Sequence, residues 1–316
     1  MRVLFSNDAL NHPGSARHLT AIWWMFADGR HTWVIEELEA VKHSAWLLGE
    51  GQRLRNSVLE HARKSARSTA RTDLYVERVG SQVRAEQSTL QVPADRAERH
   101  LRQPVVLLVE NARCDGAFVR HILLRVGAAK LRRSLGEAGF ARLQSGWSSS
   151  LGDGVWFTVR HGAGRDSATQ LDLLIESEPD LPPRTLVLVD SDRDRRDGPL
   201  GSSTAQQLTT RCQERARSIR GWLLEAFVLD KREVENYIPR EALKARLDGE
   251  KWDMWCAWNE DERDFKDLKQ HLHPKLWKVM VEPRYSNFLH ERAWRERAGR
   301  NGRELDELIQ RAMALL

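Results

Sequence analysis

Four short apolar runs, each of strand length, constrain the fold of this 316-residue chain more than any other feature. They are VVLLV (105–109), VWFTV (155–159), TLVLV (185–189) and AFVLD (226–230), and segments of helical pattern separate them. Continuous runs of β-branched and other apolar residues are typical of strands that are buried on both faces. Strands that alternate with helices at this spacing indicate β-α-β units and a largely parallel sheet. We therefore predict an α/β fold whose sheet occupies residues 104–245.

The region before this sheet, residues 1–103, has mainly helical patterns, so we predict a helical N-terminal accessory domain with no chemistry recognisable from sequence. The segment HLTAIWWMFADG (18–29) is expected to be a buried helix. Its core-facing aromatic residues would be Trp23, Trp24 and Phe26. The alternating stretches around Leu74–Val79 and Gln82–Val92 are interpreted as a hairpin.

The region after the sheet, residues 246–316, is helical in pattern and is predicted to be a C-terminal extension. Its five tryptophans lie among lysines and arginines: Trp252, Trp255, Trp258, Trp277 and Trp294. Aromatic side chains among basic ones can stack on nucleic-acid bases, but they serve more often as anchors of a helical core. We favour the core interpretation.

The charge balance is mildly basic, because 50 Lys and Arg against 45 Asp and Glu give a formal net charge of +5 and a pI near 9.3. Such an excess is compatible with a polyanionic partner without requiring one. Cys114, Cys212 and Cys256 are far apart in the sequence, which fits a reducing compartment and argues against a disulfide framework. No secretory signal pattern and no apolar run of ~20 residues is present, so we expect a cytoplasmic protein without a membrane partner.

Three of the four apolar runs end in acidic residues. They are Glu110 after the first run, Asp190 and Asp192 after the third, and Asp230 at the end of the fourth, with Glu233 and Glu235 close behind. Ligands of open parallel sheets bind outside the carboxyl ends of the strands. Residues i and i+2 of a strand share a face, so Asp190 and Asp192 converge if the backbone stays extended past Val189.

A group of carboxylates at one sheet edge needs compensation, because two of them about 4 Å apart repel by ~4 kcal/mol at an effective dielectric constant near 20. The acids could point into solvent, pair with the arginines of DSDRDRRDG (190–198), or bind a hard divalent cation. Oxygen-only ligands without nearby His or Cys favour Mg²⁺ or Mn²⁺ over Zn²⁺. A charged surface loop is the simplest explanation of DSDRDRRDG alone, whereas acids at the other strand ends favour a metal site.

Three motifs in this order resemble those of the TOPRIM domain, which is shared by topoisomerases, primases and several nucleases. LVENARCDG (108–116) resembles the first motif, a Glu often followed by Gly and then by Asp, although Asn111 stands in place of the Gly. LVDSDRD (188–194) resembles the D-x-D motif with its frequent third Asp. LDKREVENYIP (229–239) is similar to the R-x-x-E-N-Y stretch of overcoming-lysogenization-defect (OLD) nucleases. The resemblance covers about residues 104–245 and implies a Rossmann-like TOPRIM sheet, closest to the OLD branch.

The resemblance implies a two-metal site, with Mg²⁺ or Mn²⁺ as cofactor, that hydrolyses phosphodiester bonds without a covalent nucleophile. The implied metal ligands are Glu110, Asp115, Asp190, Asp192, Asp194, Glu233 and Glu235. The residues expected to carry catalysis are Glu110, Asp190, Asp192 and Glu235. Glu110 would also be a candidate general base. Glu233 competes with Glu235 for the second metal position, and Asp115 would support or ligate the second ion.

Basic residues near these motifs are candidates for contacts with nucleic acid. They are His161, Arg165, Arg193, Lys266, Lys269 and Lys278. A lysine usually assists catalysis in the OLD branch, but the sequence does not rank these lysines, and each could equally be a surface residue. RHGAGRD (160–166) could present backbone N–H groups to a phosphate or be a plain turn. The basic stretch 53–71 could follow a nucleic-acid backbone or be a solvated helix face.

The resemblance therefore implies a metal-dependent DNA endonuclease. The sequence has no G-x-x-x-x-G-K-[ST] motif, so any ATP control would come from a separate ATPase, as in a multi-subunit bacterial defence system against phage or plasmids. Dimers are common among the relatives, which makes a homodimer a reasonable expectation. Two alternatives stay open: an RNA-processing TOPRIM nuclease, and a catalytically inactive subunit that binds nucleic acid or recruits a partner. Asn111 gives the second alternative its weight, because a side chain there could crowd the metal-binding Glu.

Overall fold

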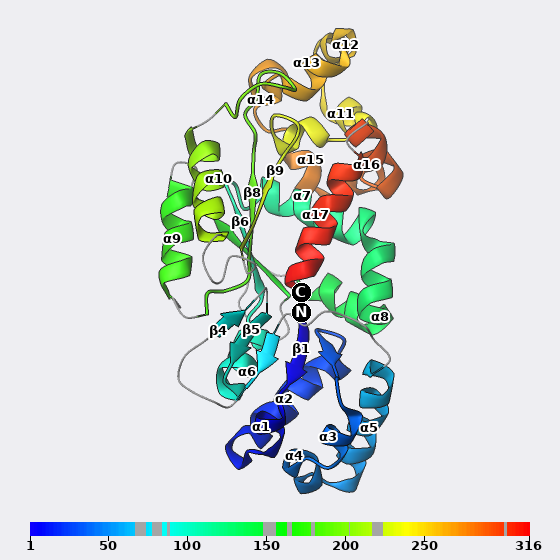
Figure 1. Cartoon of the computed structure of the whole chain (residues 1–316). Helices are drawn as coiled ribbons and strands as arrows, with labels where there is room; N and C mark the ends of the chain where they lie inside the picture. Colours follow the sequence, from blue (N-terminus) through cyan, green and yellow to red (C-terminus); the bar gives the residue numbers. More distant parts are fainter. Residues whose placement is uncertain are drawn as a thin grey trace.

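The computed structural model describes residues 1–66, 74–77, 84–86, 89–147, 156–162, 166–177, 181–201, 203–216, 224–299 and 302–316. Two sheets organise these residues, one in the N-terminal region and one in the middle of the molecule (Figure 1). Helices from the last third of the chain lie beside the central sheet and extend beyond its far end.

The N-terminal sheet has the strand order β2-β1-β3-β5-β4. Its strands are β1 (Arg2–Phe5), β2 (Thr32–Val34), β3 (Leu74–Val76), β4 (Arg84–Glu86) and β5 (Thr89–Val92). All neighbours are parallel except β4 and β5, which are antiparallel. The accompanying helices are α1 (Asn7–Asn11), η1 (Pro13–Ser15), α2 (Ala16–Ala27), α3 (Leu38–Lys42), α4 (Ala45–Gly49), α5 (Gln52–Ser65) and α6 (Ala94–Arg102).

Residues 1–103 thus form a helix-rich unit around a sheet, and the prediction of a mainly helical region missed that sheet. The predicted hairpin between residues 74–79 and 82–92 is wrong in its pairing, because β3 is parallel to β5 and the antiparallel pair is β4 with β5. These strands are three or four residues long, too short for an alternating pattern to distinguish parallel from antiparallel neighbours.

The predicted helix over residues 18–29 corresponds to α2. Trp23 and Phe26 are buried as predicted, but Trp24 is 55% exposed, so its assignment to the core was wrong. Successive residues of an α-helix are about 100° apart, which turns Trp24 away from the side that packs. Phe26 stacks on Trp33 of β2 in a hydrophobic core that belongs to the N-terminal unit.

The central sheet has four parallel strands in the order β7-β6-β8-β9. They are β6 (Val105–Val109), β7 (Phe157–His161), β8 (Thr185–Val189) and β9 (Leu224–Val228). These strands coincide with the four apolar runs to within about two residues, and every residue of β6 and β8 is buried. The predicted α/β fold with a parallel sheet is therefore confirmed.

Helices cover both faces of the central sheet (Figure 1). The helices between strands are α7 (Cys114–His121), the π-helical turn η2 (Ile122–Val126), α8 (Ala128–Ser145), α9 (Ser167–Ser177) and α10 (Ser203–Ala216). α8 contains a kink at Gly136, where φ is +71°. Val105, Leu107 and Val109 face α7, η2 and α8, whereas the alternate residues Val106 and Leu108 face α9 and α10.

The rest of the chain is helical, as predicted. Its elements are η5 (Val234–Tyr237), α11 (Arg240–Arg246), α12 (Gly249–Ala257), α13 (Glu260–Phe265), α14 (Leu268–His271), α15 (Lys278–Val281), η6 (Pro283–Phe288), α16 (Glu291–Ala298) and α17 (Gly302–Leu315). Trp255, Trp258 and Trp294 are buried, in agreement with the core interpretation. They belong to the same core as β6, β8 and α7, so the C-terminal helices complete one face of the central sheet.

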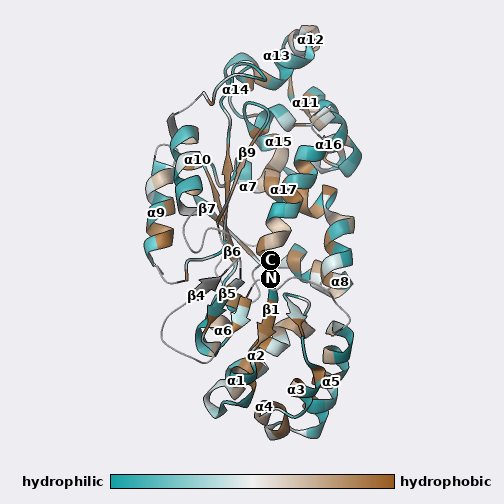
Figure 2. Ribbon diagram, in the orientation of Figure 1, coloured by the Kyte–Doolittle hydropathy of each residue, from teal (hydrophilic) through white to brown (hydrophobic). Residues whose placement is uncertain are grey.

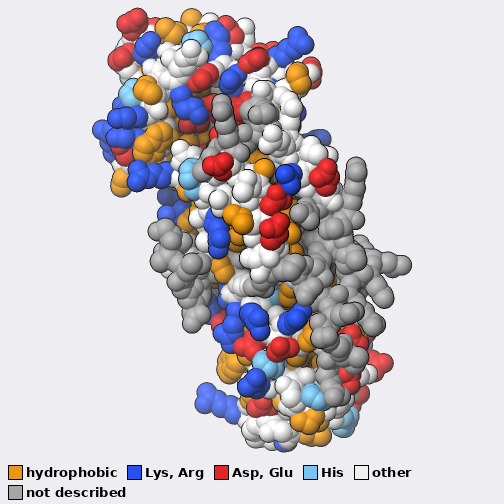
Figure 3. Space-filling model, turned by 90° about the vertical axis from the view of Figure 1, so that its left-hand side faces the viewer, with side chains coloured by type: hydrophobic (Ala, Val, Ile, Leu, Met, Phe, Trp, Pro, Cys, Tyr) orange, Lys and Arg blue, Asp and Glu red, His pale blue; other side chains and the backbone are white. Residues whose placement is uncertain are grey.

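Hydrophobic residues concentrate in the strands and on the inward sides of the helices, as Figure 2 shows. On the face seen in Figure 3, basic and acidic side chains are interspersed. Each helix in the described part of the chain is too short or too polar to span a lipid bilayer.

Candidate active site

The candidate site lies at the carboxyl ends of the central strands. The chain passes from β6 to β7 on one side and then returns to β8 on the other, so the strand order reverses between β6 and β8. A crevice at such a reversal is the usual ligand position of an open parallel sheet. Glu110 directly follows β6 and Asp190 directly follows β8 at this point.

After β6, Asn111 fixes the turn that leads into α7 and holds Asp115. The Asn111 Oδ1 atom accepts hydrogen bonds from the backbone N–H groups of Arg113 (3.0 Å) and Cys114 (3.3 Å). The backbone N–H of Asn111 donates to Asp115 Oδ2 at 2.7 Å. Asparagine thus has a local role where the TOPRIM pattern often has glycine, since a glycine could not accept these two bonds.

The side chain of Asp115 is buried beside other carboxylates. Burial raises the pKa of Asp115 to about 7; the bond from Asn111 opposes this shift, and the charges of Glu235 and Glu110 add to it. Glu110 stands at the exposed rim. Partial desolvation of its carboxyl raises the pKa of Glu110, and the charge of Asp192 raises it further.

After β8, the carboxyl of Asp190 points into this buried region. Its Oδ1 atom is buried and has no hydrogen-bond partner among the described residues. Burial raises the pKa of Asp190 well above its usual value, and the charges of Asp115 and Glu235 act in the same direction. An oxygen of this kind, left without a donor inside a carboxylate cluster, fits a cation ligand better than a structural role.

Asp192 reaches the cluster by a route other than the one predicted. The strand ends at Val189, and Asp192 has φ +50°, so the backbone does not stay extended. The turn is fixed because Asp192 N–H donates to the Arg232 carbonyl (3.0 Å) and Gly201 N–H donates to the Ser191 carbonyl (2.9 Å). A Cβ atom on Gly201 would lie 1.8 Å from the Asp192 carbonyl oxygen, so this close approach requires glycine.

After β9, a short helical turn supplies two more acids. Glu233 and Asn236 form a capping box around η5, and Glu235 lies inside it. Both glutamates are buried, and burial raises the pKa of Glu233 to about 7. Glu235 Oε1 accepts a hydrogen bond from the Cys114 thiol of α7 at 3.4 Å, which joins the β6 and β9 sides of the site.

One lysine enters this cluster. Lys269 of α14 places its Nζ atom 3.0 Å from Glu233 Oε2 and 3.8 Å from Glu235 Oε1. Burial disfavours the charge of Lys269, but Glu235 and Glu233 outweigh it and raise the pKa of Lys269 above its usual value. The lysine that the sequence could not rank is therefore the one that contacts the carboxylates.

The structure thus connects six carboxylates electrostatically: Glu110, Asp115, Asp190, Glu233 and Glu235 form the main group, and Asp192 joins it through Glu110. His161, at the end of β7, is close enough to lower the pKa of Glu110 slightly. Lys269 alone cannot balance so many acids. The carboxylate oxygens, including the Asp190 oxygen that has no hydrogen-bond donor among the described residues, fit a hard divalent cation, and the neighbouring Cys114 thiol is engaged with Glu235. Within the described residues, no three His, Cys, Asp or Glu side chains are already arranged to hold a metal ion.

Other predicted site residues lie outside the cluster. Asp194 is 89% exposed and pairs with Arg232, and Arg193 lies near Asp230. Lys266 pairs with Glu262 and stacks on the Trp258 ring, and Lys278 pairs with Glu282. Arg165 lies outside the described residues.

Sequence reasoning missed the residues that hold the η5 turn in place. The Tyr237 hydroxyl donates to Glu304 of α17 (2.6 Å) and accepts from the Lys231 N–H (3.0 Å). The buried Lys231 ammonium contacts Asp264 Oδ1 at 2.7 Å, and Arg297 contacts the same oxygen at 2.7 Å. A local sequence pattern cannot predict these contacts of Glu304 and Asp264, because the partners are 33 to 67 residues apart in the sequence.

Comparisons with protein-family models, with curated proteins and with solved structures find no significant match to this chain. The chemistry of the site therefore stands on the geometry described above.

Proposed function

We propose that this protein is a Mg²⁺- or Mn²⁺-dependent nuclease of TOPRIM type that hydrolyses phosphodiester bonds of DNA. The observation that carries the proposal is the cluster of six carboxylates at the strand-order reversal, with the buried Asp190 oxygen left without a donor. Acids in such a cluster need either bound protons, which their raised pKa values favour, or a bound cation to offset their mutual repulsion. The three sequence motifs that resemble those of TOPRIM nucleases contribute all six.

The six carboxylates would bind two metal ions between them. Glu110, Asp190 and Asp192 would hold one ion, and Glu235 a second, with Glu233 and Asp115 as supporting oxygens. Bound divalent ions of this kind lower the pKa of water and offset charge on a phosphate.

The protein's own groups would then handle protons and charge. Glu110, at the exposed rim of the cluster, is placed where a carboxylate oxygen could accept a proton from the attacking water. The water oxygen forms a bond to phosphorus while the bond to the leaving oxygen breaks, and that oxygen takes a proton from solvent. Lys269, which stays protonated, would offset negative charge on the phosphate.

Nicking of supercoiled plasmid in Mg²⁺ or Mn²⁺ tests the proposal. The double variant Asp190→Ala/Asp192→Ala is expected to lose at least about 1,000-fold in rate, since several kcal/mol of transition-state stabilisation would disappear. Asp194→Ala is the matched control, because Asp194 is exposed outside the cluster, and should keep full activity. Undiminished nicking by the double variant would refute the two-metal proposal. Matched DNA and RNA substrates separate a DNA nuclease from an RNA-processing one.

The ion pairs of Lys269 favour a second candidate, a subunit that binds nucleic acid without cleaving it. In that case the ammonium group substitutes for a metal beside Glu233 and Glu235. Calorimetric titration of the protein with Mn²⁺ distinguishes the two. If the protein is a nuclease, the wild-type protein should bind Mn²⁺. If it is a non-cleaving subunit, the wild-type protein should not bind Mn²⁺, and only the Lys269→Ala variant should.

A further inference from the structure

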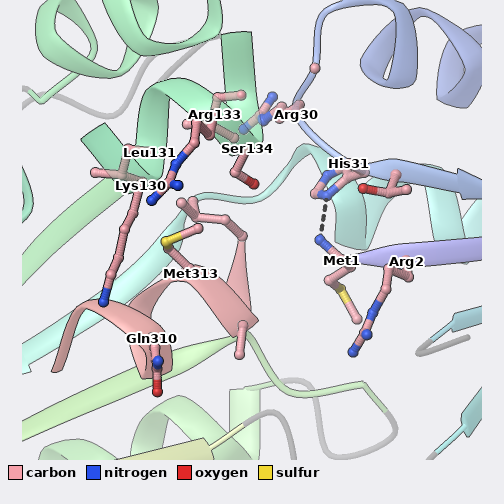
Figure 4. A pocket seen from close by; sticks show the side chains of 15 residues that line it. Met1, Arg2, Arg30, His31, Lys130, Leu131, Arg133, Ser134, Gln310 and Met313 are labelled. Atoms are coloured by element: carbon pink, nitrogen blue, oxygen red, sulfur yellow. Dashed lines mark hydrogen bonds between the residues drawn. The ribbon is translucent and has the colours of Figure 1, made fainter. Parts of the chain in front are cut away.

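A cavity with basic and apolar lining lies where the N-terminal unit meets α8 and α17, and none of the six carboxylates lines it (Figure 4). Its volume is about 610 Å³, in the range of pockets for drug-sized ligands. Lys130 and Arg133 extend from α8, Gln310 and Met313 come from α17, and Arg2 comes from β1. The pocket lies toward the amino ends of the central strands, opposite the carboxylate cluster.

The charged side chains around this pocket have one sign. Arg2, Arg30, Lys130 and Arg133 line it, and no acidic side chain does so among its described lining residues. Lys130 is paired with Asp306 (2.8 Å), and Arg30 donates to the Arg102 carbonyl (3.0 Å). Arg133 is exposed and makes no ion pair or hydrogen bond with any described residue, so its guanidinium is available to a ligand.

A buried guanidinium behind the pocket strengthens this positive field. Arg184, which immediately precedes β8, is 2% exposed and donates to the backbone carbonyls of Leu315 and Gln103. Its Nη1 atom also lies 3.4 Å from the terminal oxygen of Leu316, and none of the described Asp or Glu side chains forms an ion pair with it. Burial, together with the charge of the pocket residue Arg30, lowers the pKa of Arg184 to about 9. Basic side chains that line a cavity without an acidic side chain among the described lining residues favour an anionic occupant.

The pocket also has apolar walls. Leu131 and Leu135 of α8 and Met313 of α17 line it beside the basic groups. A phosphate alone would leave these walls and most of the 610 Å³ unused. We propose that this pocket binds a nucleotide, with its phosphates at Arg133 and the neighbouring basic residues and its base against the apolar wall.

This proposal does not depend on the nuclease assignment. The binding experiment is therefore run in EDTA, so that no divalent ion can attract phosphates to the carboxylate cluster. Isothermal titration calorimetry of the full chain with ATP, AMP, adenosine and pyrophosphate measures the affinity. Both nucleotides are expected to bind more tightly than pyrophosphate, and adenosine should bind weakest, because both phosphate and base contribute.

Two variants connect the binding to this pocket. Arg133→Glu should weaken nucleotide binding about 10- to 100-fold, the loss expected for a charge-assisted hydrogen bond. Ser134→Trp, which places bulk in the pocket without changing charge, should weaken it as well. Arg292→Glu is the charge-matched control, since Arg292 of α16 is 84% exposed and does not line the pocket.

Three results would overturn the proposal. The first is the absence of nucleotide binding at millimolar concentration, and the second is binding unchanged in both pocket variants. The third is an affinity for pyrophosphate or for a short oligonucleotide that equals the affinity for ATP. Equal pyrophosphate binding would identify a phosphate site, and equal oligonucleotide binding would identify a site for a nucleic-acid backbone. Circular dichroism of each variant confirms that the fold is kept, because Arg133 and Ser134 are both exposed.

Discussion

Asp192 has φ +50° and is the single non-glycine residue with positive φ in the described part of the chain. Backbone strain at such a position costs of order 1–3 kcal/mol and persists where the surroundings fix it, often at functional sites. Here the fixed turn directs a carboxylate to Glu110 instead of relaxing into an ordinary loop.

Two substitutions of Asp192 separate the effect of backbone strain on stability from the effect of the carboxylate charge. Asn tolerates the left-handed region and Val does not, and both remove the carboxylate. Asp192→Val should therefore lower the free energy of unfolding by about 1–2 kcal/mol relative to Asp192→Asn. Urea unfolding of the two metal-free variants measures the difference, and equal stabilities would show that the turn is not strained.

At the residue scale, the sequence located most of the cluster, because acids that follow parallel strands meet at one edge. Glu110 and Asp190 needed only that rule. Asp192 was predicted from the D-x-D motif and from an extended backbone past Val189; the extended backbone is wrong, since the position of Asp192 depends on contacts with Arg232 and Gly201 that no local pattern encodes. Lys269 could not be separated from the other lysines, because its role depends on where α14 packs.

At the scale of elements, η5 and α17 are joined by the bond between Tyr237 and Glu304. Burial raises the pKa of Glu304 to about 7, well above the value near 4.3 expected in the unfolded chain. A carboxyl with a raised pKa in the folded state opposes folding once it ionises. Its penalty is absent below about pH 4 and grows as the pH rises to about 7.

Glu304→Gln cannot ionise, so the variant should gain stability relative to wild type as the pH rises from 5 to 8. The linkage relation limits this gain to about 3 kcal/mol. Urea unfolding of both proteins at the two pH values measures it. Glu307→Gln, an exposed change on the same helix, should follow wild type. A pH trend shared by all three proteins would contradict the role of Glu304.

The sequence predicted elements best where apolar runs were long. β6 and β8 are five-residue strands buried throughout, and their runs marked them clearly. The N-terminal strands are three or four residues long, and a pattern of that length is compatible with many structures. The sequence did not predict which helices would cover the central sheet, because this depends on long-range packing. Helix α17, for example, completes one face of the sheet from the far end of the chain.

At the scale of the whole molecule, the balance between repelling acids and a bound cation should govern stability. A ligand that binds only the folded state stabilises it by about 2.7 kcal/mol at 100 times its dissociation constant. Mg²⁺ or Mn²⁺ should therefore raise the melting temperature of wild type. The Asp190→Asn substitution should raise the melting temperature of the metal-free protein. In this variant, the further rise in melting temperature on adding Mg²⁺ or Mn²⁺ should largely disappear.

Differential scanning calorimetry with EDTA and with Mn²⁺ checks this expectation. Asp194→Asn is the control, since Asp194 lies outside the cluster, and should respond to Mn²⁺ like wild type. If Asp190→Asn and wild type gained equally from Mn²⁺, the ion would be binding elsewhere.

The π-helical turn η2 has a consequence for the relation between the two ends of the central sheet. Within it the Gly127 N–H donates to the Ile122 carbonyl five residues back, so the turn holds one residue more than an α-helical turn. The helical path that starts beside Asp115 and continues to Arg133 therefore contains one residue more than its number of turns requires. Deleting one residue in the π-helical turn would leave a turn of α-helical size and keep the direction of Arg133 nearly unchanged, whereas deleting one in the regular part of α7 would rotate Arg133 by about 100° relative to the start of α7.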